Sequence, residues 1–210
     1  MARAEKTRFS VWKYVAPRIT NVMEWRDADK CLLASVLTLP FIALWIGRLA
    51  MVARNPHYGP YLNQDFLGPM LAFVWFQGFG HLAIIAAALI LRRRGRDMMW
   101  FIHLTTQFWY VCFFFSIYAV GPYTNPFAMQ FLLAAVFGLM VFPHRPVFLG
   151  LGTLGALLVV STIAERAGMI PYAPLMNAFR DESARLHTTW ILSLGVIPLL
   201  ASTLILAMFS

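Results

Sequence analysis

Residues 67–91 read LGPMLAFVWFQGFGHLAIIAAALIL and are followed directly by three arginines at 92–94. No acidic residue, lysine or arginine interrupts this apolar stretch. The hydrocarbon core of a bilayer is about 30 Å thick, so a helix with a rise of about 1.5 Å per residue needs about 20 apolar residues to cross it. The stretch is therefore long enough to cross a membrane, and the arginines mark the end of the crossing.

Five further apolar stretches meet or nearly meet the same length in this chain of 210 residues. The composition agrees, because 60% of the residues are hydrophobic and only 12% are charged. We predict an all-α polytopic membrane protein, a bundle of six transmembrane helices within residues 31–210. The six predicted spans are 31–53, 67–91, 98–120, 126–142, 146–164 and 188–209.

The basic residues indicate how the bundle is oriented. A net charge of +8 would suggest a nucleic-acid partner in a soluble protein, but most of the 17 Lys and Arg residues lie before span one or between spans two and three. By the positive-inside rule both termini are cytoplasmic, in a bacterial inner (plasma) membrane, and we expect no nucleic-acid partner.

Residues 1–30 form a basic N-terminal segment that also contains Trp12, Tyr14 and Trp25. An amphipathic stretch lying on the anionic inner leaflet fits this composition, and a solvated basic tail fits it as well. At the other face, segments 54–66 and 165–187 mix aromatic residues, prolines and charges. We expect these two segments to cover the outer end of the bundle.

Polar residues inside the spans are costly in hydrocarbon unless they face the bundle interior, a cavity or a partner. Gln77 and His81 lie one helical turn apart on span two, and Gln107 and Tyr110 follow one face of span three. His81 and Gln107 come at a similar depth when the two spans run antiparallel. We predict a hydrogen bond between them, which would serve either helix packing or ligand binding.

Aromatic residues crowd the outer halves of spans two and three, including Trp75, Phe76 and the run Phe113–Phe115. Such residues either pack helices together or line a pocket for a small amphipathic ligand. The residues that would form the ligand site are Trp75, Gln77, His81, Gln107, Trp109, Tyr110, Phe114 and Tyr118.

Several chemistries are disfavoured by the sequence. The spans contain no lysine for a retinal Schiff base and no acidic residue for a proton-coupled carrier. Closely spaced His or acidic ligands for a catalytic metal, a nucleophile motif and a phosphate-binding loop are also missing. The chain itself is expected to be no enzyme and to need no cofactor. Haem b bound by histidines of different spans, in a quinone-reactive redox sensor, is kept as an alternative, as is a small transporter.

The chain ends at Ser210 directly after the sixth apolar stretch, without a polar tail. We interpret this as a membrane module whose effector followed Ser210. Four features resemble the six-helix receptor domain of bacterial histidine kinases that detect α-hydroxyketone quorum-sensing signals: Tyr14–Ile19 before span one, Arg96-Asp97, Phe113–Phe115 and His144-Arg145. Similar modules precede class III adenylate cyclase domains.

The resemblance implies a sensor domain that binds a lipophilic or amphipathic signal and passes it to a cytoplasmic histidine kinase or adenylate cyclase. Both outputs act as dimers, so a homodimer is expected, with Gly152 and Ala156 available for close contact between helices.

Overall fold

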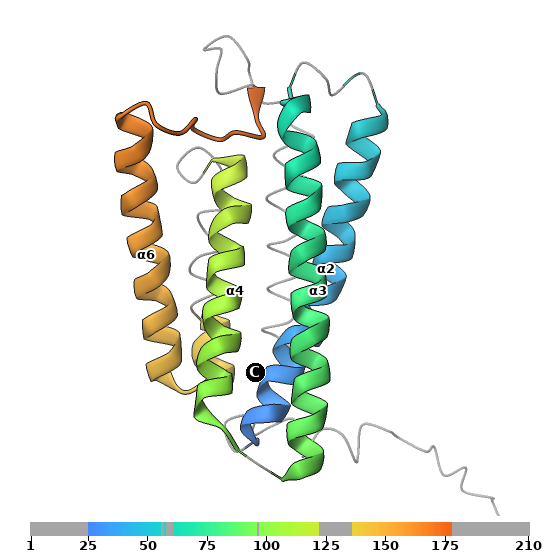
Figure 1. Ribbon diagram of the computed structural model, residues 1–210, viewed down its shortest axis with the longest axis vertical. Helices are drawn as coiled ribbons and strands as arrows, with labels where there is room; N and C mark the ends of the chain where they lie inside the picture. Colours follow the sequence, from blue (N-terminus) through green and yellow to red (C-terminus); the bar gives the residue numbers. More distant parts are fainter. Residues whose placement is uncertain (1–24, 56, 58–60, 96, 122–135, 178–210) are drawn as a thin grey trace, which may run out of the picture.

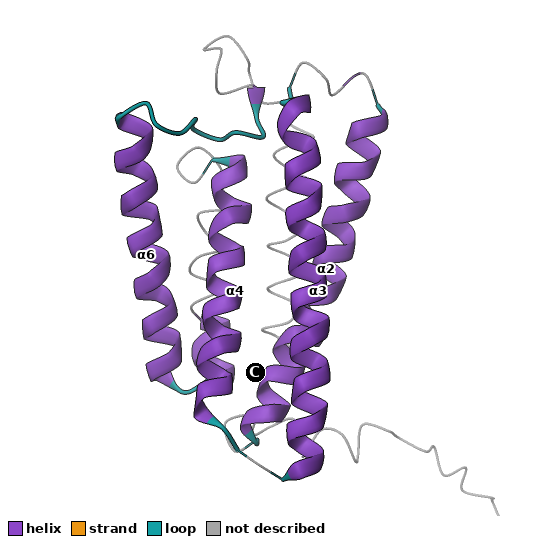
Figure 2. Ribbon diagram, viewed as in Figure 1, coloured by secondary structure: helices purple, strands orange, loops and turns teal. Residues whose placement is uncertain are grey.

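A computed structural model describes residues 25–55, 57, 61–95, 97–121 and 136–177, and these residues are helical apart from short connections. Figure 2 shows helices with short loops, and the described part holds no β-structure beyond one isolated bridge. Three of the described helices, α2, α3 and α6, are long and apolar enough to cross a membrane. The prediction of an all-helical membrane protein is confirmed to this extent. Most of the predicted fourth span and all of the sixth lie outside the described residues.

Helix α2 spans Asp27–Arg54 and helix α3 spans Gln64–Arg94. Both helices extend past the predicted apolar stretches, because the polar residues next to these stretches are favourable at helix termini. Acidic residues stand in the first turn of each helix and arginines in the last turn, where the helix dipole favours these charges. Gly95 ends α3 with a φ of 67°, a left-handed conformation that glycine adopts without strain. The predicted boundary between residues 30 and 31 therefore falls inside α2.

Helix α4 spans Met99–Val120 and helix α6 spans His144–Arg166, while residues 136–141 form a helical segment between them. The helices lie side by side along the long axis of the molecule (Figure 1). Among the described helices, backbone contacts are most extensive between α2 and α3 and between α4 and α6, fewer between α2 and α4, and sparse between α3 and α4. The described helices thus form two pairs, which meet mainly through α2 and α4.

The two ends of the bundle differ. The arginine end holds the start of α2, the end of α3 and the start of α4, with ion pairs Arg26–Asp97 (3.4 Å) and Arg92–Asp29 (3.2 Å). At the opposite end, residues 167–177 run from α6 across the bundle to the start of α3 (Figure 1). The prediction that segments of 54–66 and 165–187 cover this end is confirmed for residues 61–63 and 171–177, which hydrogen-bond to each other.

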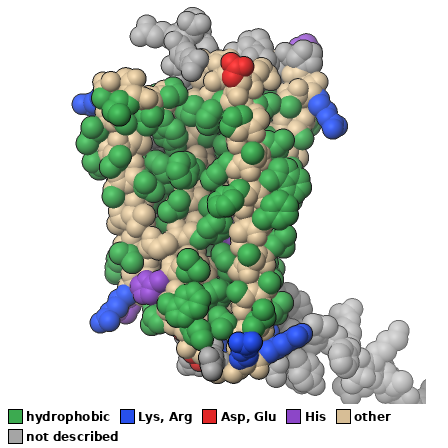
Figure 3. Space-filling view, in the orientation of Figure 1, with side chains coloured by type: hydrophobic (Ala, Val, Ile, Leu, Met, Phe, Trp, Pro, Cys, Tyr) green, Lys and Arg blue, Asp and Glu red, His purple; other side chains and the backbone are tan. Residues whose placement is uncertain are grey.

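Charged side chains gather at the two ends of the molecule, and hydrophobic side chains cover most of the surface between them (Figure 3). Large apolar residues such as Phe76, Phe79 and Val160 are more than 60% exposed in this band. A soluble protein does not present so much apolar surface, whereas a bilayer solvates it. The surface agrees with the membrane assignment.

Candidate functional site

His81 lies in the protein interior on α3, with only 1% of its surface exposed, and neither ring nitrogen has a hydrogen-bond partner. Its closest ring neighbour is Phe108 of α4, whose edge meets the imidazole at a centroid distance of 5.3 Å. A buried polar group without a partner loses the hydrogen bonds it would make to water, which costs about 1–3 kcal/mol. The imidazole therefore departs from the rule that buried polar groups are hydrogen-bonded, and this departure needs an explanation.

The predicted hydrogen bond between His81 and Gln107 is wrong, although the two helices meet at the predicted depth. The amide nitrogen of Gln107 is buried and also lacks a partner. Phe108, the next residue, occupies the contact instead, because Gly80 leaves room for its ring. A β-carbon on Gly80 would lie only 2.1 Å from Cζ of Phe108. Aromatic packing against a glycine has displaced the polar pair.

Two hydroxyl groups that the sequence analysis did not single out are also buried without a regular hydrogen bond. Ser35 of α2 is 0% exposed, and its side-chain oxygen lacks a hydrogen-bond partner. Thr105 of α4 is 2% exposed, and its hydroxyl lies beside the thiol of Cys31 without a regular hydrogen bond. Other hydroxyls in these helices, such as those of Thr38 and Thr106, donate to the carbonyl four residues earlier. Most Ser and Thr hydroxyls in helices form this bond, and the sequence does not show which of them will not. Ser35 and Thr105 therefore could not be picked out from the sequence.

Three of these side chains form what we call the polar seam: Ser35, His81 and Thr105. Gln107 follows Thr105 by two residues and therefore points to the other side of α4. Gly78 faces Ile42, and Arg92 binds Asp29. By this antiparallel alignment, Ser35 lies about four residues, or about 6 Å along the helix axis, from the level of His81. Thr105 lies about one helical turn before Phe108, which touches His81. The seam therefore occupies about two helical turns where α2, α3 and α4 meet.

His81 of the polar seam lies between two apolar clusters. The cluster toward the 167–177 segment contains Ile42 of α2 and Val74 of α3, and the cluster toward the arginine end contains Ala34 and Ile84 of the same helices. His81 falls between these positions on α3. His81 is consequently shielded at both ends by packed side chains, while Thr105 lies within the cluster toward the arginine end, between Ile102 and Tyr110.

Trp75 and Phe76 do not share an inner wall with the other aromatic residues, contrary to the predicted pocket. They are 48% and 61% exposed on the outside of the bundle. Val74, Gly78 and His81 take the buried face of α3, so positions 75 and 76 turn outward. Gln77, also among the predicted site residues, is half-buried.

The remaining predicted residues belong to α4 and are packed. Tyr110 is 0% exposed, and its ring lies against the backbone of α6 at Gly150, where a β-carbon would come within 2.1 Å of Cδ2. Phe114 is buried and stacks on Tyr118 at 5.9 Å, while Trp109 stacks on Phe113 at 6.0 Å. The two stacked pairs run along α4 itself, whereas Tyr110 packs against α6 and Trp109 also meets Phe137 at 6.1 Å.

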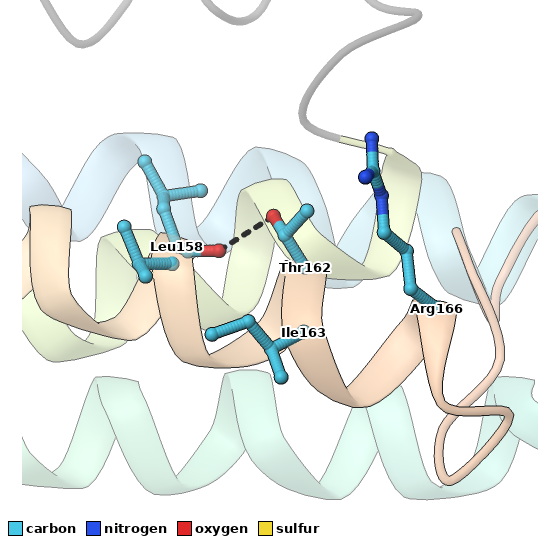
Figure 4. Close-up of a pocket in the computed structure, with 5 residues that line it drawn as sticks. Leu158, Thr162, Ile163 and Arg166 are labelled. Carbon is cyan, nitrogen blue, oxygen red and sulfur yellow. Dashed lines mark hydrogen bonds between the residues drawn. The ribbon is translucent and has the colours of Figure 1, made fainter.

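A groove of about 260 Å³ lies elsewhere, along α6, and contains none of the predicted site residues. Figure 4 draws the lining residues and labels four of them, with the hydroxyl of Thr162 donating to the carbonyl of Leu158 at 2.7 Å. The described lining residues all belong to α6: Leu158, Val159, Thr162, Ile163 and Arg166. Among the described residues the groove therefore has a wall from one helix alone.

Within the described ranges, no three His, Cys, Asp or Glu side chains are grouped so that they could hold a metal ion. The two cysteines, Cys31 and Cys112, are free and buried. Comparisons of the chain with protein-family models, with curated proteins and with solved structures find no match.

Proposed function

We propose that this chain is the membrane input domain of a signalling protein, a six-helix module with cytoplasmic termini that binds a lipophilic or amphipathic signal. The observation that carries the proposal is His81, an imidazole in the protein interior with both nitrogens unpartnered. Native proteins rarely keep such a group without a use, and intramembrane polar residues often mark binding sites. A ligand head group that enters the polar seam would supply the missing hydrogen bonds.

The chemistry of the seam defines the ligand's head group. Ser35 and Thr105 each offer a hydroxyl that donates or accepts, and His81 offers one donor and one acceptor. None of these groups is charged when the imidazole is neutral. The seam therefore suits an uncharged head group with hydrogen-bonding oxygens, attached to an apolar body that tolerates the surrounding hydrocarbon.

The arrangement in two helix pairs supports a relay. The α2–α3 pair and the α4–α6 pair contact each other less than the helices within each pair do, and they meet mainly through α2 and α4. We propose that the two pairs shift against each other at the seam. A ligand that binds one arrangement better shifts the population toward it. We propose that this shift reaches a cytoplasmic histidine kinase or class III adenylate cyclase, as the resemblance in sequence suggests.

We also propose that the module works as a homodimer through α6. Gly152 and Ala156 are exposed one turn apart on this helix, and no other side chain lies within 4 Å of a β-carbon placed on Gly152. Small residues at this spacing allow two helices in a membrane to approach closely. Cross-linking of a Gly152→Cys variant in membranes is expected to give a dimer, and an equal yield from Val147→Cys, which is buried, would argue against this face.

Native mass spectrometry of the protein released from its own membrane is the direct test of ligand binding. We expect a co-purifying amphiphile that is retained by Trp75→Leu, a change on the outer surface, and lost from His81→Leu. Equal retention by both variants would place the ligand outside the seam. A Soret absorption band would instead favour the haem-containing redox sensor, and substrate flux into proteoliposomes would favour a transporter.

A further inference from the structure

Residues 171–177 pair with the start of α3 like a short piece of antiparallel sheet. The backbone N–H of Asn63 donates to the carbonyl of Leu175, and the N–H of Asn177 donates to the carbonyl of Tyr61, both at 2.9 Å. We call residues 171–177 the clasp. The pairing joins parts of the chain that are more than 100 residues apart, so it depends entirely on the tertiary structure.

Two asparagine side chains reinforce this pairing from opposite sides. The amide of Asn63 donates to the carbonyl of Pro174 at 3.0 Å, and the amide of Asn177 donates to the carbonyl of Leu62 at 2.8 Å. Asn63 also accepts a hydrogen bond from the N–H of Asp65 and so caps α3. The clasp is thus fixed to the first residues of α3 by both backbone and side chains.

The clasp is bound to α4 as well. The N–H of Leu175 donates to the carbonyl of Ala119 at 3.0 Å, and the hydroxyl of Tyr118 donates to the carbonyl of Pro171 at 2.5 Å. Since the clasp continues directly from α6, one segment connects α6, α4 and α3. It is a link between the two helix pairs at the end remote from the arginines.

The contacts around the clasp keep it in place, as its buried apolar side chains and one strained backbone conformation show. Ala173, Leu175 and Met176 are each 1% exposed and belong to the apolar cluster that also contains Leu62. Ala173 has a φ of 44°, in the left-handed region that an L-residue adopts only at a cost. Such a conformation persists when the contacts around it are strong enough to impose it.

We infer that the clasp is a gate: while it is closed it holds the two helix pairs together, and its release from α3 opens the polar seam. The inference does not depend on the proposed function, because opening can be measured without a ligand. Cys112 of α4 is a native reporter, since it lies four residues after Phe108 and seven after Thr105, on the face of α4 that meets the seam. It is only 2% exposed in the closed state.

The first experiment removes the two reinforcing side chains in the full chain, with Asn63→Ala and Asn177→Ala combined, and follows alkylation of Cys112 by N-ethylmaleimide with peptide mass spectrometry. The loss of these hydrogen bonds is expected to raise the labelling rate about tenfold. Cys31 is 0% exposed and its thiol lies beside Thr105 of the seam, so its labelling should rise together with that of Cys112. Asn55→Ala is the matched variant, because the side chain of Asn55 is half-buried and accepts a hydrogen bond from the nearby N–H of His57.

The second experiment closes the gate covalently with Leu62→Cys and Met176→Cys. These residues form a bridge between the flanking hydrogen bonds, so their Cα atoms are expected to be about 4.5 Å apart, which suits a disulfide. Oxidation should lower the labelling of Cys112 below that of the wild type, and reduction should restore it. This variant decides the question if the asparagine variant fails to fold.

Three results would overturn the inference. The first is an unchanged labelling rate at Cys112 in a folded asparagine variant. The second is a rise at Cys112 without a rise at Cys31, because Cys31 borders the seam through Thr105 and an open seam would expose both thiols. The third is a locked disulfide variant with the same rate in its oxidised and reduced forms.

Discussion

The α4–α6 interface and the α3–α4 contact both place an aromatic ring of α4 against a glycine, yet they differ in how tightly the ring is held. A β-carbon on Gly150 would meet Cδ2, Cε2 and Cγ of Tyr110, which is 0% exposed. A β-carbon on Gly80 would meet the tip of Phe108, whose ring is half-buried. The ring of Tyr110 has no space to move into, whereas the ring of Phe108 has.

This difference separates a structural interface from an adaptable one. The α4–α6 contact is apolar and dense, with Tyr110 also close to Gly138. The α3–α4 contact is sparse and has unpartnered polar atoms beside it. Dense packing of this kind gives one stable arrangement, while a sparse contact permits two. We expect ligand-dependent motion at the second contact and not at the first.

The largest effect is expected from Gly150→Ala. The new methyl group would overlap the enclosed ring of Tyr110, and overpacking of this kind typically costs about 1–3 kcal/mol. Thermal unfolding in lipid nanodiscs measures the loss. Gly47→Ala is the control, because it adds the same methyl group to an exposed position of α2 in open space, away from α6. Equal stability of the two variants would show that Tyr110 is free to move and would remove the contrast between the interfaces.

His81→Leu is expected to act in the opposite direction. Leucine fills a similar space without polar atoms, so the variant should be as stable as the wild type or more stable by about 1 kcal/mol. The same unfolding measurement on ligand-free protein tests this. His103→Leu, at a half-buried histidine that is not among the unpartnered groups, is the comparison. A clear loss of stability in His81→Leu would mean that the imidazole already has a partner.

Gly80→Ala sharpens the comparison most directly, because its β-carbon would approach a ring as closely as that of Gly150, at 2.1 Å. Only the tip of the half-buried Phe108 ring has to move, so we expect a loss of less than about 1 kcal/mol. The ring movement should also change the environment of His81, observable as a shift of its imidazole signals in NMR spectra. A loss as large as that of Gly150→Ala would show that the α3–α4 contact is as rigid as the α4–α6 interface.

The smallest effect is expected at the arginine end, outside both interfaces. In the Arg92–Asp29 ion pair, 58% of the arginine side chain and 23% of the aspartate side chain are exposed. Arg92→Gln should cost less than about 0.5 kcal/mol, and the difference from the wild type should shrink at high salt. A larger, salt-independent loss would indicate that this pair holds α2 and α3 together more firmly than exposure suggests.

The sequence by itself determined that the chain forms apolar helices of membrane length and roughly where α2, α3, α4 and α6 run. Length and composition are sufficient for this, because a bilayer requires long helices whose backbone groups are satisfied internally. It also brought His81 and Gln107 to the same depth. The six-span count, the orientation and the ligand remain predictions.

Only the tertiary structure decided which way each helix faces. In a membrane helix nearly every side is apolar, so hydrophobic periodicity does not distinguish the lipid-facing side from the buried one. Trp75 therefore faces outward and Phe108 meets His81, as the glycines at 78 and 80 and the rings around them allow. The clasp, too, arises from pairing between residues more than 100 positions apart, which no local pattern of the sequence encodes.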